Sequence, residues 1–241
     1  MLNSKVTKAV LLAAGRGTRM RELTQDLPKP MIEVRGKPIL MHILEGLRKT
    51  GITHFLIIVG YRADVIKSFF RNGSSHSVSV EYCTQVEQDG TGRVVELARE
   101  FCGNAPFVLS YGDILVDPDN YRSLCELGDE KAIVSVKHNP GEVSKGGAVF
   151  VNERFELTDL REKPRPGEPS SPWYNAGIYT FRPVIFDFTA RLELSIRGEY
   201  ELTDAIRSLA LSGGKVKVVE LKGDWVDVRD PEIVKQLNEG S

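Results

Sequence analysis

The sequence predicts an α/β fold in which helices cover both faces of a largely parallel sheet. Short apolar runs alternate with amphipathic segments over residues 1–140, and this rhythm is typical of βαβ units. The chain has 241 residues, of which 41% are hydrophobic and 27% are charged. This length is enough for a substantial core, so we expect a single domain over residues 1–241.

Each strand predicted in the first half is a short apolar run, and each predicted helix is amphipathic. The expected strands are residues 9–14, 54–60, 78–82, 107–111 and 132–136. The expected helices are residues 38–50, 63–70, 92–101 and 118–127. Strands that are separated by helices in this way usually pair in parallel, so we expect both faces of the sheet to be buried.

The helix that opens at Pro38 carries the clearest end signals. Pro38 can occupy the first helical position, because its fixed backbone angle suits a helix and its missing N–H is not needed there. Apolar residues then recur at helical spacing at Ile39, Ile43 and Leu47. Gly51 can adopt the left-handed conformation that ends a helix, so the helix should stop just before it.

The pattern changes at Gly146, where shorter strands are predicted at residues 147–151 and 175–181. Helices are expected near residues 183–192, 203–211 and 231–238. Residues 163–172, KPRPGEPSSP, are expected to form a mobile loop beside a site, because their prolines remove hydrogen-bond donors and their glycine and serines favour turns. We interpret residues 141–241 as a lid on the sheet.

The overall charge is nearly balanced, with 32 Lys and Arg against 33 Asp and Glu. The net charge of -1 gives no field that would attract nucleic acid or an anionic membrane, so we expect neither as a partner. No apolar run approaches the roughly 20 residues that span a bilayer. The run 9–14 follows Lys5 and Lys8, but it is too short for a secretory signal.

The three cysteines, Cys83, Cys102 and Cys125, are an odd number without CxxC spacing. This usage favours a reducing compartment, so we expect the protein in the cytoplasm. Cys102 falls on a predicted helix, where a free thiol behaves as a small hydrophobic side chain.

The segment LLAAGRGTRM, residues 11–20, is the most informative part of the chain. A predicted buried strand ends at Ala14, and Gly15 and Gly17 then let the backbone approach a ligand with its N–H groups exposed. Such a loop suits an anionic phosphate chain, and Arg19 and Lys29 add positive charge. The P-loop pattern is absent, and Met20 stands where the dinucleotide fingerprint needs a small residue.

The combination of LAAGRGTRM with LPKP, residues 27–30, resembles the sugar-1-phosphate nucleotidyltransferases. This family includes glucose-1-phosphate thymidylyltransferase and the uridylyltransferases that make UDP-N-acetylglucosamine and UDP-glucose. Similar motifs recur in order over about residues 8–230, at Gln85 with Asp89–Gly92, Gly112–Asp113, Gly146–Gly147, Glu162–Pro164, Asn175–Tyr179, Glu201–Asp204 and Trp225–Asp227.

The resemblance implies a Rossmann-like three-layer α/β/α sandwich. It also implies that about residues 1–140 bind a nucleoside triphosphate and about residues 141–241 bind a sugar 1-phosphate. The nucleotide would lie on Leu12, Ala13, Ala14, Gly15, Gly17, Gln85 and Gly90. The sugar phosphate would lie on Gly147, Glu162, Lys163 and Asn175. Arg19, Lys29 and Lys163 would carry the catalysis, by neutralising phosphate charge.

Two carboxylates are expected to hold Mg²⁺ by the same resemblance, namely Asp113 and Asp227. Asp113 follows the apolar run 107–111 and a glycine, at the carboxyl end of a predicted parallel strand, where ligands of open α/β sheets bind. A hard cation needs oxygen ligands and often takes one or two carboxylates together with water and substrate phosphates.

Several points stay open at the level of sequence. Tyr111 and Arg93 depart from the residues usual in the family, which weakens any assignment of the base. The LAAG loop and Gln85 favour UTP or dTTP. The alternatives are a cytidylyltransferase acting on phosphocholine or inositol phosphate, and an inactive regulatory relative. Homo-oligomerisation also stays open, and no acetyltransfer is expected, because a C-terminal β-helix is absent.

Overall fold

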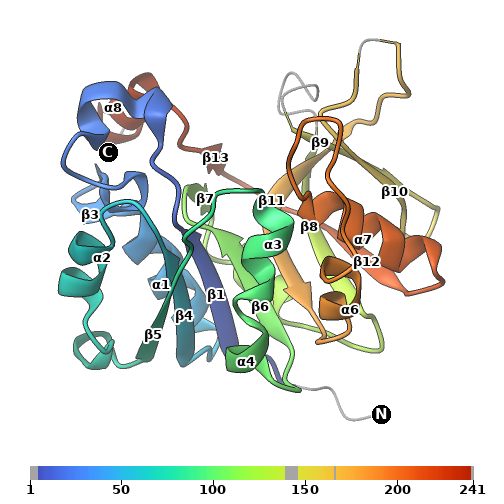
Figure 1. Cartoon of the computed structure of the whole chain (residues 1–241), viewed down its shortest axis with the longest axis horizontal. Coiled ribbons are helices and arrows are strands. Elements are labelled where there is room, and N and C mark those ends of the chain that lie inside the picture. The colour runs from blue at the N-terminus through green and yellow to red at the C-terminus, as the bar shows by residue number, and fades with distance from the viewer. Residues whose placement is uncertain (1–4, 139–145, 166, 240–241) are drawn as a thin grey trace.

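The computed structural model describes residues 5–138, 146–165 and 167–239. Its centre is a nine-stranded sheet in the order β10-β9-β11-β6-β1-β4-β5, from which β8 and β12 continue beside β11 (Figure 1). The strands of this sheet are β1 (Lys8–Ala13), β4 (His54–Val59), β5 (Ser79–Thr84), β6 (Phe107–Tyr111), β8 (Ala132–His138), β9 (Gly147–Val151), β10 (Leu157–Glu162), β11 (Trp173–Phe181) and β12 (Val216–Glu220).

The sheet is mainly parallel, as predicted. β1 pairs in parallel with β4 on one side and β6 on the other, and β4 pairs in parallel with β5. β11 is antiparallel to β6, β8 and β9, and β10 is antiparallel to β9. β10 and β11 therefore run opposite to the other strands of this sheet. The chain turns to opposite sides of β1, and ligands of open α/β sheets bind at such a switch point.

Helices cover both faces of the sheet and make three layers (Figure 1). One core cluster packs against α1 (Ile39–Lys49), α2 (Ala63–Phe70), α5 (Asn120–Leu124) and α8 (Pro231–Glu239). The other packs against α3 (Thr91–Glu96), α4 (Arg99–Cys102), α6 (Ile185–Thr189) and α7 (Leu202–Leu211). Strand β1 divides its side chains between them, because Ala9 and Leu11 belong to the first cluster and Val10 to the second.

Short ladders and 3-10 helices lie around the central sheet. Two short ladders pair β2 (Glu33–Val34) with β3 (Lys37–Pro38) and β7 (Ile114–Val116) with β13 (Trp225–Asp227). The 3-10 helices are η1 (Thr18–Thr24), η2 (Lys29–Met31) and η3 (Ser74–His76). The terminal helix α8 lies against η1 and β2, so the end of the described chain supports the segment after β1 (Figure 1).

The helix boundaries follow the sequence signals with two corrections. Pro38 precedes α1 in an extended conformation (φ -54°, ψ 142°), so the prediction that it takes the first helical position is wrong by one residue. Gly51 has φ 96°, as the predicted left-handed cap requires. The single helix predicted over 92–101 is two helices, because Leu97 and Ala98 donate to carbonyls three residues back and tighten the turn.

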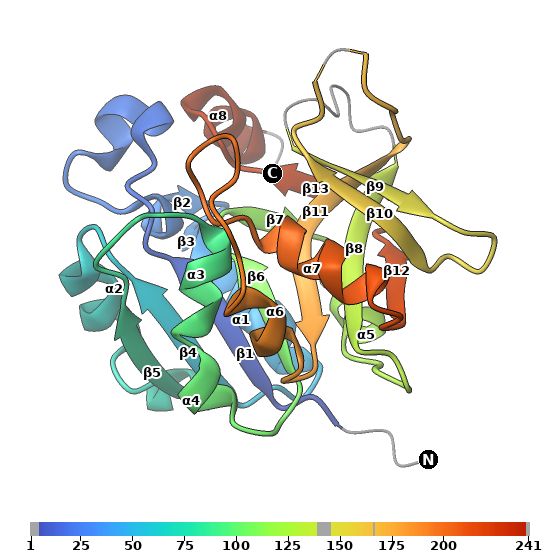
Figure 2. The same ribbon diagram turned by 45° about the vertical axis from the view of Figure 1, so that its right-hand side comes forward.

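The strands after Gly146 join the central sheet directly. β11 pairs with β6, and α7 packs along β10 at the far edge (Figure 2). The strands β7, β10 and β12 are not among those that the sequence predicts. The loop predicted over residues 163–172 connects β10 to β11, and its Pro166 lies outside the described residues.

Two smaller expectations can be compared with the structure. Within the described ranges, no helix is both long and apolar enough to cross a membrane. Cys102 is buried at the end of α4, and burial raises the pKa of its thiol to about 12, so it packs as a small hydrophobic side chain, as predicted.

Candidate active site

The loop after β1 exposes its backbone through two glycines in different surroundings. Gly17 has φ 67°, and a Cβ atom there would lie 2.7 Å from Cβ of Lys29. A Cβ atom on Gly15 would meet nothing within 4 Å. One glycine of the loop is therefore packed against Lys29, and the other faces open space that a ligand could fill.

A pocket of about 290 Å³ lies beside this loop. Its walls are Leu12, Ala14, Gly15, Gln85, Gln88, Gly90, Thr91, Val94 and Glu199. Five of the seven residues predicted to bind nucleotide line this pocket. The other two do not, because Ala13 is buried in the core and Gly17 packs against Lys29. The sequence did not predict Gln88, which donates a 3.1 Å hydrogen bond to the Ala14 carbonyl.

Gly90 has a steric reason to be glycine. Its φ is 124°, and a Cβ atom would lie 2.4 Å from the backbone oxygen of Tyr200. Tyr200 in turn donates a 2.8 Å hydrogen bond to the Asp89 carbonyl and accepts a 2.7 Å hydrogen bond from Gly92. The segment before α7 is thereby fixed onto the wall of this pocket, which we call the nucleotide-side pocket after the residues predicted to bind nucleotide.

A charged cluster lies at the carboxyl end of β6, where Asp113 was expected. Nζ of Lys29 is 2.5 Å from Oδ2 of Asp113, and the Lys29 side chain is only 12% exposed. Val228 donates a 3.0 Å hydrogen bond to the Asp113 carbonyl, which brings the end of β13 and its Asp227 to the same place. The structure thus brings together both predicted metal ligands and one predicted catalytic lysine.

Electrostatics tie the same groups together. Burial, and then the charge of Asp113, raises the pKa of the Asp227 carboxyl, while Lys29, Arg229 and Arg19 lower it. Arg19 itself is exposed. The cations compensate the negative charge of Asp113 and Asp227 only in part, so a further positive charge beside the two carboxylates would be stabilised.

The donor set suits a hard cation. In the described part of the chain, no three His, Cys, Asp or Glu residues lie together as a ready metal site. Asp113 and Asp227 supply two carboxylates, which matches a cation that takes its remaining ligands from water and phosphates. The residues present therefore fit Mg²⁺ in this mode.

A second pocket, of about 220 Å³, opens beside Asp227. It contains every residue predicted to bind the sugar phosphate: Gly147, Glu162, Lys163 and Asn175. A Cβ atom on Gly147 would lie 3.0 Å from Cβ of Asn175, so the glycine keeps the pocket floor open. Lys163 has φ 44°, an uncommon value for a side-chain-bearing residue, and its N–H donates a 2.9 Å hydrogen bond to Gly146.

A bulge in β11 aims Asn175 into this pocket. The pairing with β8 shifts register between Asn175 and Tyr179, and Gly177 in the bulge has φ 80°. The amide of Asn175 donates a 2.7 Å hydrogen bond to the Tyr179 hydroxyl. The backbone groups of Ile178 bond with the Ser135 hydroxyl, which satisfies the interrupted ladder.

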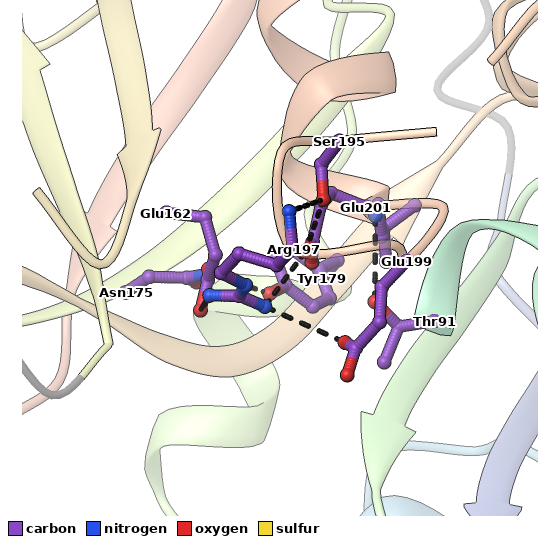
Figure 3. A network of polar contacts seen from close by, with 9 residues as sticks. Thr91, Glu162, Asn175, Tyr179, Ser195, Arg197, Glu199 and Glu201 are labelled. Carbon is purple, nitrogen blue, oxygen red and sulfur yellow. Dashed lines mark hydrogen bonds and ion pairs between the residues drawn. The ribbon is translucent and has the colours of Figure 1, made fainter. Parts of the chain in front are cut away.

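Sequence reasoning gave no role to several polar residues of the two pockets. Arg197, Glu199 and Glu201 line the second pocket, which we call the sugar-side pocket after the residues predicted to bind the sugar phosphate. Thr91 and Glu199 line both pockets. Figure 3 shows Arg197 between Glu162 and Glu199. These added residues lie outside the strands, and the only signals near them were the motifs Asp89–Gly92 and Glu201–Asp204.

Tyr111 lines the sugar-side pocket. Burial raises the pKa of its hydroxyl to about 12, while the side chains of Tyr179 and Thr91 lower it. The unusual tyrosine noted in the sequence therefore lies in this pocket, and its ring packs edge-on against that of Tyr179.

Known proteins resemble this chain over nearly its whole length. The nucleotidyl transferase family matches residues 8–237. The protein belongs to the nucleotidyl transferase family. This chain is 34% identical over 228 residues to the UTP–glucose-1-phosphate uridylyltransferase AglF of Haloferax volcanii, covering 93% of this chain and 92% of that protein. It is 37% identical over 232 residues to the bifunctional protein GlmU of Methanocaldococcus jannaschii.

The GlmU match covers 95% of this chain but 53% of that protein, so the chain spans about half the length of such relatives. Among solved structures, a UDP-glucose pyrophosphorylase complexed with UDP-glucose superposes with a TM-score of 0.86 at 23% identity, covering 98% of each chain. A putative glucose-1-phosphate thymidylyltransferase from Bacillus anthracis superposes with a TM-score of 0.83 at 26% identity, covering 96% of this chain and 94% of that one. The Rossmann-like α/β fold of this chain agrees with both.

Proposed function

We propose that the protein transfers a nucleoside monophosphate from a nucleoside triphosphate, UTP or dTTP, to a sugar 1-phosphate, which gives a nucleotide sugar and pyrophosphate. The observation that carries this proposal is the pair of adjoining pockets, which share Thr91 and Glu199. One pocket has a glycine loop suited to a triphosphate, and the other has polar side chains suited to a sugar. The AglF relative, named for this reaction type, supports the choice.

The reaction needs little proton transfer. A phosphate monoester has a second pKa near 6, so at neutral pH the oxygen of a sugar 1-phosphate is already a nucleophile. This oxygen attacks the α-phosphorus of the triphosphate, and the bond to the β-phosphate oxygen breaks to release pyrophosphate. The protein's task is to bring two anions together in line, which depends on alignment and charge neutralisation.

Three cations of this chain are suited to that task. Lys29 packs against the glycine loop and is held by Asp113, so its position is fixed before substrate binds. Lys163 lines the sugar-side pocket, where it would bind the phosphate of the second substrate. Arg19 is exposed, and it would close over the triphosphate from the loop side.

Asp113 and Asp227 would hold Mg²⁺ beside these cations. When bound, the ion would polarise the phosphoryl oxygens and offset the charge that develops on the leaving pyrophosphate. Glu162 and Asn175 would bind sugar hydroxyls, because a partly buried carboxylate and an amide supply an acceptor and a donor. The base would lie against Gln85 and Gly90, and the amide of Gln85 can match a pyrimidine edge.

A substrate matrix tests the proposal. The purified protein is incubated with Mg²⁺ and each common nucleoside triphosphate, against sugar 1-phosphates, choline phosphate and inositol phosphate, and pyrophosphate release is measured. We expect release with UTP or dTTP and at least one sugar 1-phosphate. Release only with CTP and choline phosphate or inositol phosphate would support the cytidylyltransferase alternative, and no release with any pair would support an inactive relative.

A further inference from the structure

Tyr61 lies just after β4 and contacts both ends of the segment formed by residues 16–25. Its hydroxyl is 3.1 Å from the carbonyl oxygen of Thr24 and 2.5 Å from that of Gln25, so it donates its one proton to this pair of acceptors. The guanidinium carbon of Arg16 lies 5.2 Å from the centre of the Tyr61 ring, within the range of a cation–π interaction. One half-buried side chain therefore bridges the start and the end of the segment.

The backbone around Tyr61 is held against the glycine loop. The N–H of Tyr61 donates a 3.1 Å hydrogen bond to the Ala14 carbonyl, which also accepts a 3.1 Å hydrogen bond from the Gln88 amide. A Cβ atom on Gly60 would lie 2.6 Å from that carbonyl oxygen, so the close approach requires glycine. Because Ala14 lines the nucleotide-side pocket, the side chain of Tyr61 starts from a backbone that is fixed against the wall of this pocket.

Thr24 connects Tyr61 back to the glycine loop. Thr24 is 4% exposed, and its hydroxyl lies 3.2 Å from the Gly17 carbonyl oxygen and 3.3 Å from that of Arg21. Arg21 has φ 51° and ψ -118°, which interrupts the 3-10 helix η1 and is uncommon for a residue with a side chain. A backbone kink of this kind persists only where the surrounding contacts fix it, and the hydrogen bonds of Thr24 and Tyr61 are such contacts.

We propose that Tyr61 is a positioning residue of the triphosphate site, which holds residues 16–25 in the shape that presents Arg19 and the loop backbone to the phosphates. The inference rests on the proposed function, because it needs a triphosphate beside Gly15. Tyr61 does not line the nucleotide-side pocket, so it acts through the segment. Without its contacts, the segment would have to be ordered when the nucleotide binds, and the lost conformational entropy would weaken binding.

Limited trypsin digestion tests these contacts without any assumption about the reaction. The segment contains three exposed arginines after which trypsin cleaves, Arg16, Arg19 and Arg21. Tyr61→Phe keeps the ring and removes the hydroxyl, so cleavage at these sites, identified by mass spectrometry, should become about threefold to tenfold faster, the scale of one lost hydrogen bond. Tyr61→Leu also removes the ring face that Arg16 contacts, and it should speed cleavage further.

Calorimetric titration then measures the effect on the nucleotide. We expect Kd for UTP and dTTP to rise about threefold to tenfold in Tyr61→Phe. In steady-state kinetics, KM for the triphosphate should rise by a similar factor, while KM for the sugar 1-phosphate changes less than about twofold. A general structural role would instead lower Tm and the fraction of active protein and leave both KM values unchanged.

Tyr82→Phe is the matched control, because the surroundings of Tyr82 repeat those of Tyr61. The Tyr82 hydroxyl donates a 2.6 Å hydrogen bond to the Arg71 carbonyl, and Nζ of Lys67 lies 5.9 Å from the centre of its ring. Tyr82 lies in β5 and does not line the nucleotide-side pocket. The control should therefore keep the rate of cleavage within residues 16–25, Kd for the triphosphate and both KM values.

The outcomes distinguish this inference from the proposed function. If the unmodified protein shows no turnover with any triphosphate and sugar 1-phosphate, the proposed function fails, and the inference fails with it. If the unmodified protein is active and Tyr61→Phe is cleaved no faster within residues 16–25, the proposed function stands and Tyr61 does not hold the segment. Faster cleavage with unchanged Kd and KM for the triphosphate would show that the segment does not serve the nucleotide, and it would likewise overturn the inference.

Discussion

Replacement of Gly15 or Gly17 by Ala adds the same methyl group at two positions of the loop after β1. The two variants should differ in stability and in nucleotide binding, in opposite directions. At Gly15 the added methyl group meets nothing within 4 Å, and φ is not positive. The fold should tolerate it, with a gain of up to about 1 kcal/mol from a less flexible unfolded chain. At Gly17 the backbone is left-handed, and the methyl carbon would lie 2.7 Å from Cβ of Lys29.

The cost at Gly17 can be worked out from these observations. A left-handed conformation costs a residue with Cβ about 1–2 kcal/mol, and displacement of Lys29 adds to this cost. For a chain of this size, each kcal/mol lowers Tm by roughly 2–4 °C. We therefore expect Gly17→Ala to unfold several degrees below the unmodified protein, whereas Gly15→Ala should keep or slightly raise Tm.

Nucleotide binding should be weakened in Gly15→Ala, the variant that keeps its Tm. Gly15 lines the nucleotide-side pocket, so its methyl group should keep the phosphates from the backbone N–H groups and weaken binding by about tenfold or more, since hydrogen bonds to charged groups are worth about 1.5–3 kcal/mol. Calorimetric titration with UTP and dTTP measures this directly. An unchanged Kd in Gly15→Ala, with Tm also unchanged, would refute the assignment of the loop to the triphosphate.

Three further predictions follow from the proposed function. Asp113→Asn and Asp227→Asn should each lower turnover by at least about 100-fold, and excess EDTA should abolish activity, whereas full activity in EDTA would contradict the metal assignment. Lys163→Ala should lower turnover and keep triphosphate binding, whereas Arg19→Ala should impair both, as titration of each variant with nucleotide would reveal. In steady-state kinetics, kcat/KM for UTP or dTTP should exceed that for ATP and GTP by about tenfold or more, and Gln85→Ala should reduce this preference. The highest kcat/KM with GTP for every sugar phosphate would contradict the assignment of the base.

Much of the fold could be predicted because its strands are apolar runs and its helices have end signals. β1, β4 and β6 are buried on both faces, so each appears as a continuous hydrophobic run. β10 could not be recognised in this way, because its residues LTDLRE are largely polar and its pairing with β9 contains an irregularity at Asp159. β12 does carry a signal, since Val216 and Val218 are buried and alternate with half-buried neighbours.

Some residues of the candidate site could likewise be predicted from the sequence, and others could not. Gly15, Asp113 and Glu162 could be named from sequence, because each lies in a motif that resembles those of the family, and Gly15 and Asp113 also follow predicted strands. Arg197 could not, because it lies outside the recognised motifs and meets Glu162 only after β10 and the segment before α7 come together. The two pockets likewise arise from the closure of distant segments, such as the fixing of Tyr200 onto Gly90.

The fate of the α-phosphate tests the central proposal most directly. The protein is incubated with Mg²⁺, a sugar 1-phosphate and UTP or dTTP labelled with ³²P at the α-phosphorus, and the products are separated. The proposed reaction places the label in a nucleotide sugar and leaves pyrophosphate unlabelled, with the two products formed in equal amounts. Label recovered in free nucleoside monophosphate or diphosphate, without a nucleotide sugar, would contradict it.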